Sequence, residues 1–218
     1  MILAIDTATR WTGLALHDGA TVVAEHGWRS VNTQTVEMAP AIAQMLKRAE
    51  MATSDLKAIA VALGPGSYTG LRVGLGVAKG IALGVQIPLV GIPTLDIVAA
   101  AVGQMPGQLV AVAEAGRHRI TVNCYSWQNK RGWRAEQLPS NTTWEELLEQ
   151  LEPPAAFTGE ISPQARRHIR HEAKGFQILR PAARVRRAAY LAELGWERLR
   201  KGEADDPAEL VPIYLREP

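Results

Sequence analysis

Short apolar runs alternate with helical patterns along the first half of the chain. Three runs joined by turns predict a β-meander over residues 2–6, 12–16 and 21–25. A helix is expected from Thr35, because apolar residues then recur every three or four positions, at Met38, Ile42, Met45, Leu46 and Ala49. Next come a buried strand at 58–63, a glycine-rich helix, a strand near 88–91 and a short helix near 95–101.

The segment that follows the strand at 58–63 reads Gly-Pro-Gly-Ser-Tyr-Thr-Gly-Leu-Arg from residue 64 to residue 72. Its first three residues end the strand, and Ser67 or Thr69 can cap the helix that follows. A strand, a glycine loop and a helix N-terminus together offer backbone N–H groups that could meet an anion. The helix itself is rich in glycine, which costs about 1 kcal/mol per residue relative to alanine in a helix interior.

The glycines of this helix fall on two neighbouring ridges at 100° per residue. Gly70, Gly74 and Ala78 form ridge one, and Gly76, Gly80 and Gly84 form ridge two. Ridges without side chains let other backbones approach closely. Packing within the chain would explain one ridge. Two ridges suggest two neighbours, so a partner chain is expected on one of them.

The pattern restarts after a hinge at residues 103–107. Strands are predicted at 109–114, 119–127 and 132–138, and a capping box from Thr143 to Glu146 opens a helix through Leu151. A strand at 155–158, a basic region at 162–187, a helix at 185–200 and an extended tail at 211–216 complete the chain. These elements predict a duplicated α/β protein with an N-terminal lobe at 1–104 and a C-terminal lobe at 105–184, with 185–218 packing back on the first lobe.

Composition narrows the class of protein. The chain has 218 residues, of which 47% are apolar, a fraction typical of a globular protein with a full core. No run approaches the roughly 18 apolar residues that a membrane span needs, and the N-terminus lacks the basic start of a signal peptide. A single cysteine, Cys124, excludes an internal disulfide framework. A cytoplasmic protein without a membrane partner is expected.

The spacing of glycine, lysine and histidine in this sequence does not match the common cofactor-binding and catalytic motifs. Both glycine series are one residue too long for a dinucleotide fingerprint, and Lys79-Gly80 reverses the order of a P-loop. A zinc peptidase helix needs two histidines four residues apart, whereas His168 and His171 are three apart among arginines that repel a cation. No metal or cofactor is expected. Asp6, at the end of the first strand, is the only carboxylate placed for chemistry, and hydrogen bonding to its own turn is the alternative role.

A cluster of arginines marks the basic region, where Arg166, Arg167 and Arg170 are three of eight cations between residues 162 and 187. Such a cluster can attract the phosphates of a nucleic acid such as tRNA. The alternative is a solvated helical face, and aromatic residues for base stacking are sparse there.

Three segments together resemble the TsaB (YeaZ) family: Ile-Asp-Thr-Ala-Thr at residues 5–9, the glycine motif at 64–72, and Pro-Ile-Tyr-Leu-Arg at 212–216. The resemblance implies the actin-like ATPase fold (ASKHA, ribonuclease H-like), with two lobes that each contain a β-meander. It also implies a non-catalytic scaffold in the bacterial complex that forms threonylcarbamoyladenosine in tRNA. There the chain would bind and activate the catalytic paralogue TsaD, beside the ATPase TsaE, and would touch tRNA weakly or indirectly. A stand-alone actin-like ATPase or kinase, and a metallopeptidase-like protein, are the alternatives.

The resemblance also implies a partner-binding face on the two helices of the first lobe, which would serve a homodimer when TsaD is absent. The residues assigned to it are Met38, Ile42, Met45, Leu46, Gly70, Arg72, Val73, Gly74, Val77, Ala78, Gly80 and Ile81. Asp6 would be a vestige of a catalytic site. Gln34 stands where many members have histidine, and residues 114–118 replace the usual Asp-Ala-Arg-Arg-Gly, so roles of those side chains do not carry over.

Overall fold

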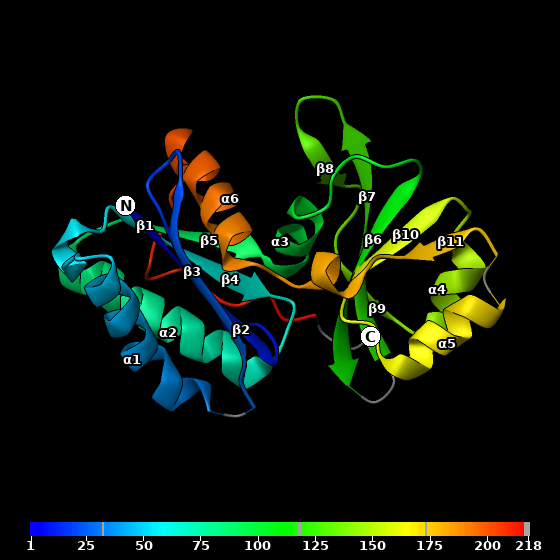
Figure 1. Ribbon diagram of the computed structural model, residues 1–218, viewed down its shortest axis with the longest axis horizontal. Coiled ribbons are helices and arrows are strands. Elements are labelled where there is room, and N and C mark those ends of the chain that lie inside the picture. The colour runs from blue at the N-terminus through cyan, green and yellow to red at the C-terminus, as the bar shows by residue number, and fades with distance from the viewer. Residues whose placement is uncertain (32, 117–118, 173, 216–218) are drawn as a thin grey trace. The chain divides into compact units, whose positions relative to one another are not determined.

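The computed structural model describes residues 1–31, 33–116, 119–172 and 174–215 (Figure 1). It forms two compact units. Unit 1 contains Met1–Ile97 and Arg187–Tyr214, and unit 2 is built on Val98–Arg186. Each unit has one β-sheet with helices packed against it. Across the described ranges, no helix combines the length and the apolar character required to cross a membrane.

The sheet of unit 1 has five strands in the order β3-β2-β1-β4-β5. They are β1 (Ile2–Asp6), β2 (Trp11–His17), β3 (Val22–Arg29), β4 (Ala58–Gly64) and β5 (Leu89–Pro93). The first three form the expected antiparallel meander, in which Leu3 pairs with Leu16 and Ile5 with Leu14. β4 and β5 join in parallel on the other side of β1.

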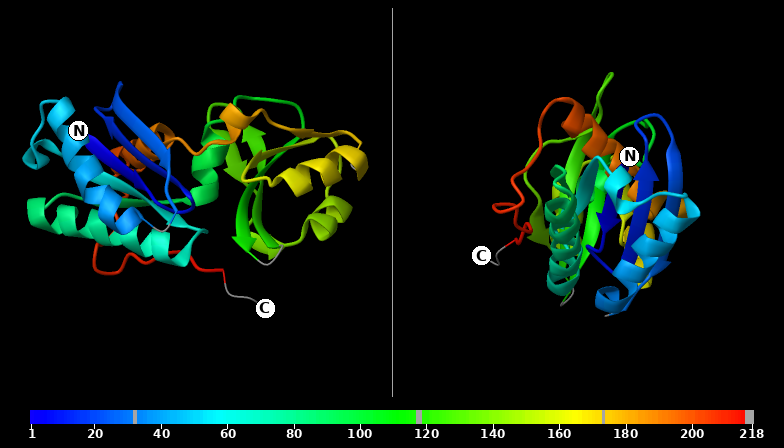
Figure 2. Two further views of the ribbon diagram at one scale, coloured as in Figure 1. Left: turned by 60° about the horizontal axis from the view of Figure 1, so that its bottom comes forward. Right: turned by 90° about the vertical axis from the view of Figure 1, so that its left-hand side faces the viewer.

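Helices cover both faces of this sheet (Figures 1 and 2). They are α1 (Gln34–Arg48), α2 (Tyr68–Val85) and α6 (Ala188–Arg200); the short η1 (Thr53–Asp55) precedes β4, and α3 (Thr94–Ala100) follows β5. Leu3, Ile5, Leu14 and Leu16 join the core under α1 and α2. Ile2, Ala4 and Ala15, which point the opposite way because side chains alternate along a strand, join the core under α6. Burial of both faces explains the continuous apolar run of the first strand.

The last helix, α6, begins later than the sequence pattern suggests. Residues 181–184 form the short η2 (Pro181–Arg184), and the backbone at Val185 and Arg187 is extended. The helix expected from residue 185 therefore starts at Ala188 and packs on the strands of unit 1.

Unit 2 has a six-stranded sheet in the order β11-β10-β6-β7-β8, with β9 paired to β7. The strands are β6 (Gln108–Gly116), β7 (Arg119–Gln128), β8 (Gly132–Ala135), β9 (Ser140–Thr142), β10 (Ala155–Gly159) and β11 (Phe176–Ile178). The strand expected at 132–138 is wrong in its extent: it ends at Ala135, and the chain resumes pairing with β7 at β9.

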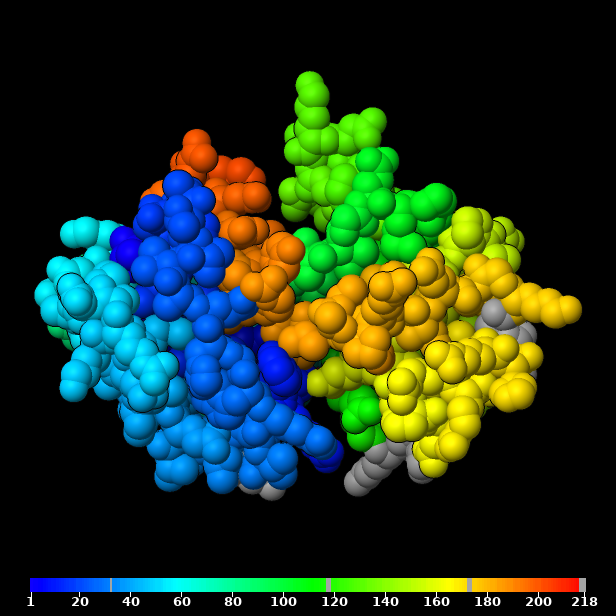
Figure 3. Space-filling model, in the orientation of Figure 1, coloured from blue at the N-terminus to red at the C-terminus, as the bar shows by residue number. Residues whose placement is uncertain are grey.

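Two helices pack on this sheet, α4 (Trp144–Gln150) and α5 (Pro163–Glu172), and α5 is exposed on the surface of unit 2 (Figure 3). The predicted capping box at α4 is present, since Thr143 Oγ1 accepts from Glu146 N at 3.2 Å and Glu146 Oε2 accepts from Thr143 N at 3.1 Å. α5 and β11 lie in the basic region, where apolar periodicity is too weak to predict them.

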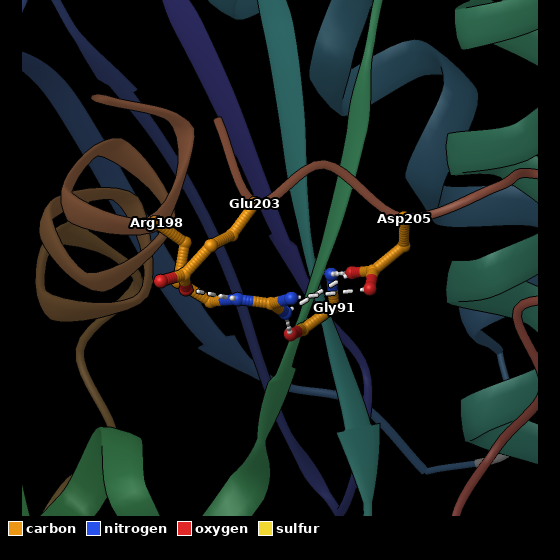
Figure 4. Close-up of polar contacts among 4 residues, drawn as sticks. All are labelled: Gly91, Arg198, Glu203 and Asp205. Atoms are coloured by element: carbon orange, nitrogen blue, oxygen red, sulfur yellow. Dashed lines mark hydrogen bonds and ion pairs between the residues drawn. The ribbon is translucent and has the colours of Figure 1, made fainter. Parts of the chain in front are cut away.

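One edge of the unit 1 sheet is closed by side chains (Figure 4). At β5, Gly91 N donates to Asp205 Oδ2 at 2.7 Å, and Arg198 Nη1 donates to Gly91 O at 2.7 Å. Arg198 also pairs with Asp205 at 3.1 Å and lies 3.5 Å from Glu203, while Asp205 N donates to Leu89 O at 2.9 Å. Charged side chains and the chain after α6 therefore satisfy the backbone groups that a sixth strand would otherwise bind.

Candidate functional site

The glycine motif forms the turn from β4 into α2. Ser67 caps α2, because its Oγ accepts a hydrogen bond from Gly70 N at 3.3 Å, as one of the two sequence alternatives predicted. Gly64 N donates to the buried Thr94 hydroxyl at 3.0 Å, which fixes the start of the turn.

The turn after β1 fills the space in front of the α2 N-terminus. Ser67 N donates to Ala8 O at 2.6 Å, and Thr7 Oγ1 donates to Gly70 O at 2.6 Å. A Cβ atom on Gly66 would overlap Ala8 O, and one on Gly70 would overlap Thr7 O. The glycines of this loop therefore permit a close approach of the chain's own backbone.

Asp6 supports the same turn. Its side chain is fully buried, and its Oδ1 accepts a hydrogen bond from Ala8 N at 2.9 Å, which is an Asx-turn. The geometry matches the structural role that the sequence left open for this residue. Asp6 holds the turn that carries Thr7, and Thr7 in turn contacts α2.

Ridge one packs inside unit 1. Gly70, Gly74 and Ala78 are buried, and a Cβ atom on Gly74 would overlap Thr7 Oγ1. Four further residues expected on the partner face, Met38, Ile42, Met45 and Leu46, are buried in the core under α1. These seven positions are buried within unit 1, because the apolar stripe of an amphipathic helix first satisfies the chain's own core.

Ridge two is open. Gly76, Gly80 and Gly84 are exposed, and no atom of a described residue lies within 4 Å of a Cβ built on any of them. Val73, Val77 and Ile81 are half-buried beside this ridge, and Leu83 is exposed. Figure 2 shows α2 on the outside of unit 1, next to α1. This part of α2 is a smooth, mainly apolar strip that another helix could approach closely.

A cluster of three side chains lies at the start of α2. The Arg72 guanidinium lies 4.0 Å from the centre of the Tyr68 ring, and its Nε donates to Tyr214 Oη at 3.2 Å. That hydrogen bond raises the pKa of Arg72. Ile213 N donates to Leu63 O at 2.7 Å, so the closing Pro-Ile-Tyr motif lies beside the glycine loop.

Tyr68 and Tyr214 are 55% and 42% exposed and were not among the expected contact residues. This cluster was not predicted from the sequence, because 142 residues separate Arg72 from Tyr214. The joint occurrence of both motifs in one family was the available signal, and it did not show that they are in contact. The final arginine of the closing motif, Arg216, lies outside the described residues, as do Arg117 and His118. Gln34, at the departure from the family pattern, is a buried residue at the start of α1.

The three arginines considered for tRNA lie on α5 but do not point the same way. Arg167 and Arg170 are exposed, whereas Arg166 is half-buried and its Nε has no hydrogen-bond partner among the described residues. Burial, together with the charge of Arg166, lowers the pKa of Arg184. Of the three candidate arginines, Arg167 and Arg170 are therefore the two whose positive charge is freely accessible.

Comparison with known sequences places the chain beside tRNA-modification proteins. The family model described as "TsaD: tRNA N6-adenosine threonylcarbamoyltransferase" matches residues 32–137. A Bacillus subtilis (strain 168) protein named "tRNA threonylcarbamoyladenosine biosynthesis protein TsaB" is 34% identical over 221 residues, which cover 99% of this chain and 93% of the relative. The Escherichia coli (strain K12) protein of the same name is 33% identical over 62% of this chain and 59% of its own length.

Solved structures support the fold. YeaZ from Pseudomonas aeruginosa superposes with a TM-score of 0.80 at 23% identity, covering 98% of this chain and 99% of that one. The ethanolamine utilization protein EutJ from Carboxydothermus hydrogenoformans gives a TM-score of 0.50 at 12% identity, covering 89% of each chain. The expected fold class, an actin-like ATPase fold with two α/β lobes, is confirmed.

Proposed function

Since the chain belongs to the TsaB family of tRNA threonylcarbamoyladenosine biosynthesis proteins, we propose that it is a non-catalytic scaffold that binds and activates a catalytic TsaD subunit. The observation that carries this proposal is the open ridge two on α2, where no described atom lies within 4 Å of a Cβ built on its glycines. We place the complex in the cytoplasm, with the ATPase TsaE as a further subunit.

The proposed contact surface consists of the accessible part of the α2 face. Gly76 and Gly80 allow a partner helix to approach the backbone, and Val73, Val77 and Ile81 supply apolar area beside them. Arg72 lies at the exposed start of the face, held by its two tyrosines. A pair of helices from TsaD would complete a helical bundle with α1 and α2. A second copy of this chain would use the same face when TsaD is absent, so the two assemblies would compete.

The buried position of Asp6 supports the non-catalytic assignment. A group that transfers a phosphoryl moiety or positions its metal must reach the reacting atoms. Asp6 is fully buried and accepts a hydrogen bond from Ala8 N, and the neighbouring Thr7 is bonded to α2. A structural role for this carboxylate accounts for these contacts, and ATP hydrolysis would then belong to TsaE.

Reconstitution tests the proposal. Cognate TsaD, TsaE and tRNA are combined with ATP and an activated threonylcarbamoyl donor, with and without this chain, and threonylcarbamoyladenosine is measured by mass spectrometry of digested tRNA. Product is expected only when the chain is present, and the pure chain is expected to hydrolyse no ATP above background. Full product without the chain would contradict the scaffold role. ATP turnover by the pure chain that Asp6→Ala abolishes would instead favour a stand-alone actin-like ATPase.

We also propose that Arg167 and Arg170 contact the tRNA backbone in the assembled complex. Replacing both by glutamate should weaken tRNA retention, most strongly at low salt, where exposed charges are least screened. Loss of two phosphate contacts should reduce the slope of log K against log salt by about 1.4–1.8. Filter binding across a salt series measures this, with Arg200→Glu plus Lys201→Glu at the end of α6 as the charge-matched control. An unchanged slope would identify these α5 arginines as a solvated face.

A further inference from the structure

The two edges of the unit 1 sheet differ in whether their outward backbone groups have hydrogen-bond partners. The β5 edge is closed by Arg198 and Asp205, as Figure 4 shows. At the other edge, no strand in the described part of the chain pairs with the outer side of β3. Natural proteins usually protect such an edge with lysine, proline or a bulge. β3 reads Val-Val-Ala-Glu-His-Gly-Trp-Arg, without lysine or proline, and its register is irregular only where it begins.

A groove runs beside this open edge. It has a volume of about 730 Å³ and lies between β3 and α1. β3 contributes His26 and Trp28, whose side chains stack with ring centres 4.8 Å apart. α1 contributes Glu37, Pro40, Ala41, Ala43, Gln44 and Lys47. The short side chains of Pro40, Ala41 and Ala43 occupy little of its volume.

The strand and the helix are fixed relative to one another by a hydrogen bond across the groove. Trp28 Nε1 donates to Glu37 Oε2 at 2.9 Å, and Thr33 Oγ1 donates to Glu37 Oε1 at 2.6 Å. Hydrogen bonds from Ser30, Thr33 and Trp28 lower the pKa of Glu37. Glu37 is therefore ionised, and its oxygens are engaged by these neighbouring donors, whereas Lys47 forms no ion pair with a described residue. Lys47 is thus the charged group of the groove that is free to pair with a bound carboxylate.

An exposed strand edge beside a helix is the arrangement in which extended peptides bind by strand addition. We propose that the β3 edge and its groove bind an extended, acidic peptide segment of a partner protein as a sixth strand. Its main chain hydrogen-bonds to the outward N–H and C=O groups of β3. Alternate side chains enter the groove over Pro40 and Ala41, and a carboxylate pairs with Lys47. This surface includes no residue of α2, so the proposal does not depend on ridge two, although α1 takes part in both proposals.

Peptide selection tests this site directly. A phage-displayed library of random eight-residue peptides is selected on the full chain, with the Gln44→Trp variant as counter-selection because tryptophan at this exposed groove position fills the space. Enriched peptides should carry small or β-branched residues at alternate positions and at least one carboxylate. A synthetic copy with N-methyl groups at alternate residues should bind at least about tenfold more weakly, since main-chain bonds supply the affinity. Lys47→Glu should weaken binding by about fivefold.

Two control variants lie on α6 and at its C-cap, and α6 covers the opposite face of the sheet. Glu197→Trp introduces the same tryptophan and Lys201→Glu the same charge reversal at exposed positions, so both should leave peptide binding unchanged. Melting temperatures of all four variants should match the parent. No enrichment against Gln44→Trp, or a selected peptide that tolerates N-methylation, would overturn the proposal. The proposal would also be overturned if the pure chain self-associates and Gln44→Trp abolishes that self-association, because a second copy would then occupy the edge.

Discussion

Replacing Gly74 by leucine is expected to destabilise unit 1 by about 2–6 kcal/mol. The new side chain would enter the space of Thr7 Oγ1, which is buried and bonded to Gly70 O. The cost combines overpacking with loss of that hydrogen bond. Because a whole domain is stable by only about 5–15 kcal/mol, much of the population should unfold. Urea denaturation followed by circular dichroism measures the change in the free energy of unfolding.

Gly76→Leu is the matched control, since it makes the same substitution two residues along the same helix. Within the described part of the chain, no atom lies within 4 Å of a Cβ at Gly76. Leucine has a better helix propensity than glycine, so this variant should be more stable than the parent by about 0.5–1 kcal/mol. Equal stability of the two variants would mean that ridge one is not packed against Thr7. It would also remove the reason for assigning the partner to ridge two.

The sequence predicted the two sheets because strand alternation and turn residues are local signals. The meander of β1, β2 and β3 follows from three short apolar runs and the Asp18-Gly19 turn. Boundaries were less accurate where long-range contacts decide them. The Pro181–Arg184 turn and the extended residues after it delay α6 to Ala188, and no periodic pattern encodes that delay.

The candidate site was predictable only in part, because helical spacing shows which residues share a face and not what that face meets. The spacing gave both glycine ridges correctly. Spacing could not show that Thr7 packs against ridge one while ridge two stays open. The contact between Thr7 and ridge one joins residues 63 positions apart in the sequence. Helical spacing was equally ambiguous for Met38 and Ile42, because an apolar stripe fits a core and an interface equally well. In the structure both residues are buried in the core of unit 1. Pairing of Arg72 with Tyr214 has the same non-local origin.

Gly80→Leu is expected to leave the fold intact while abolishing most of the capture of TsaD. Gly80 is exposed and no residue that the structure describes has an atom within 4 Å of its Cβ position, so leucine has room in the free chain. In a helical bundle that uses ridge two, the same side chain would force the helices apart. Overpacking of about 1–3 kcal/mol corresponds to a roughly five- to 150-fold loss of affinity. Calorimetric titration with cognate TsaD, alongside the melting temperature, measures both effects.

Three comparisons make this result specific to ridge two. Glu197→Leu places the same side chain on an exposed position of α6 and should bind TsaD like the parent. Gly80→Ala should weaken binding less than Gly80→Leu, because one methyl group separates the helices less. Sedimentation velocity of the pure chain should show that Gly80→Leu also weakens any self-dimer, since both assemblies are proposed to use one face. A Gly80→Leu variant that keeps parental stability and parental affinity for TsaD would show that the partner binds elsewhere, even though ridge two is open.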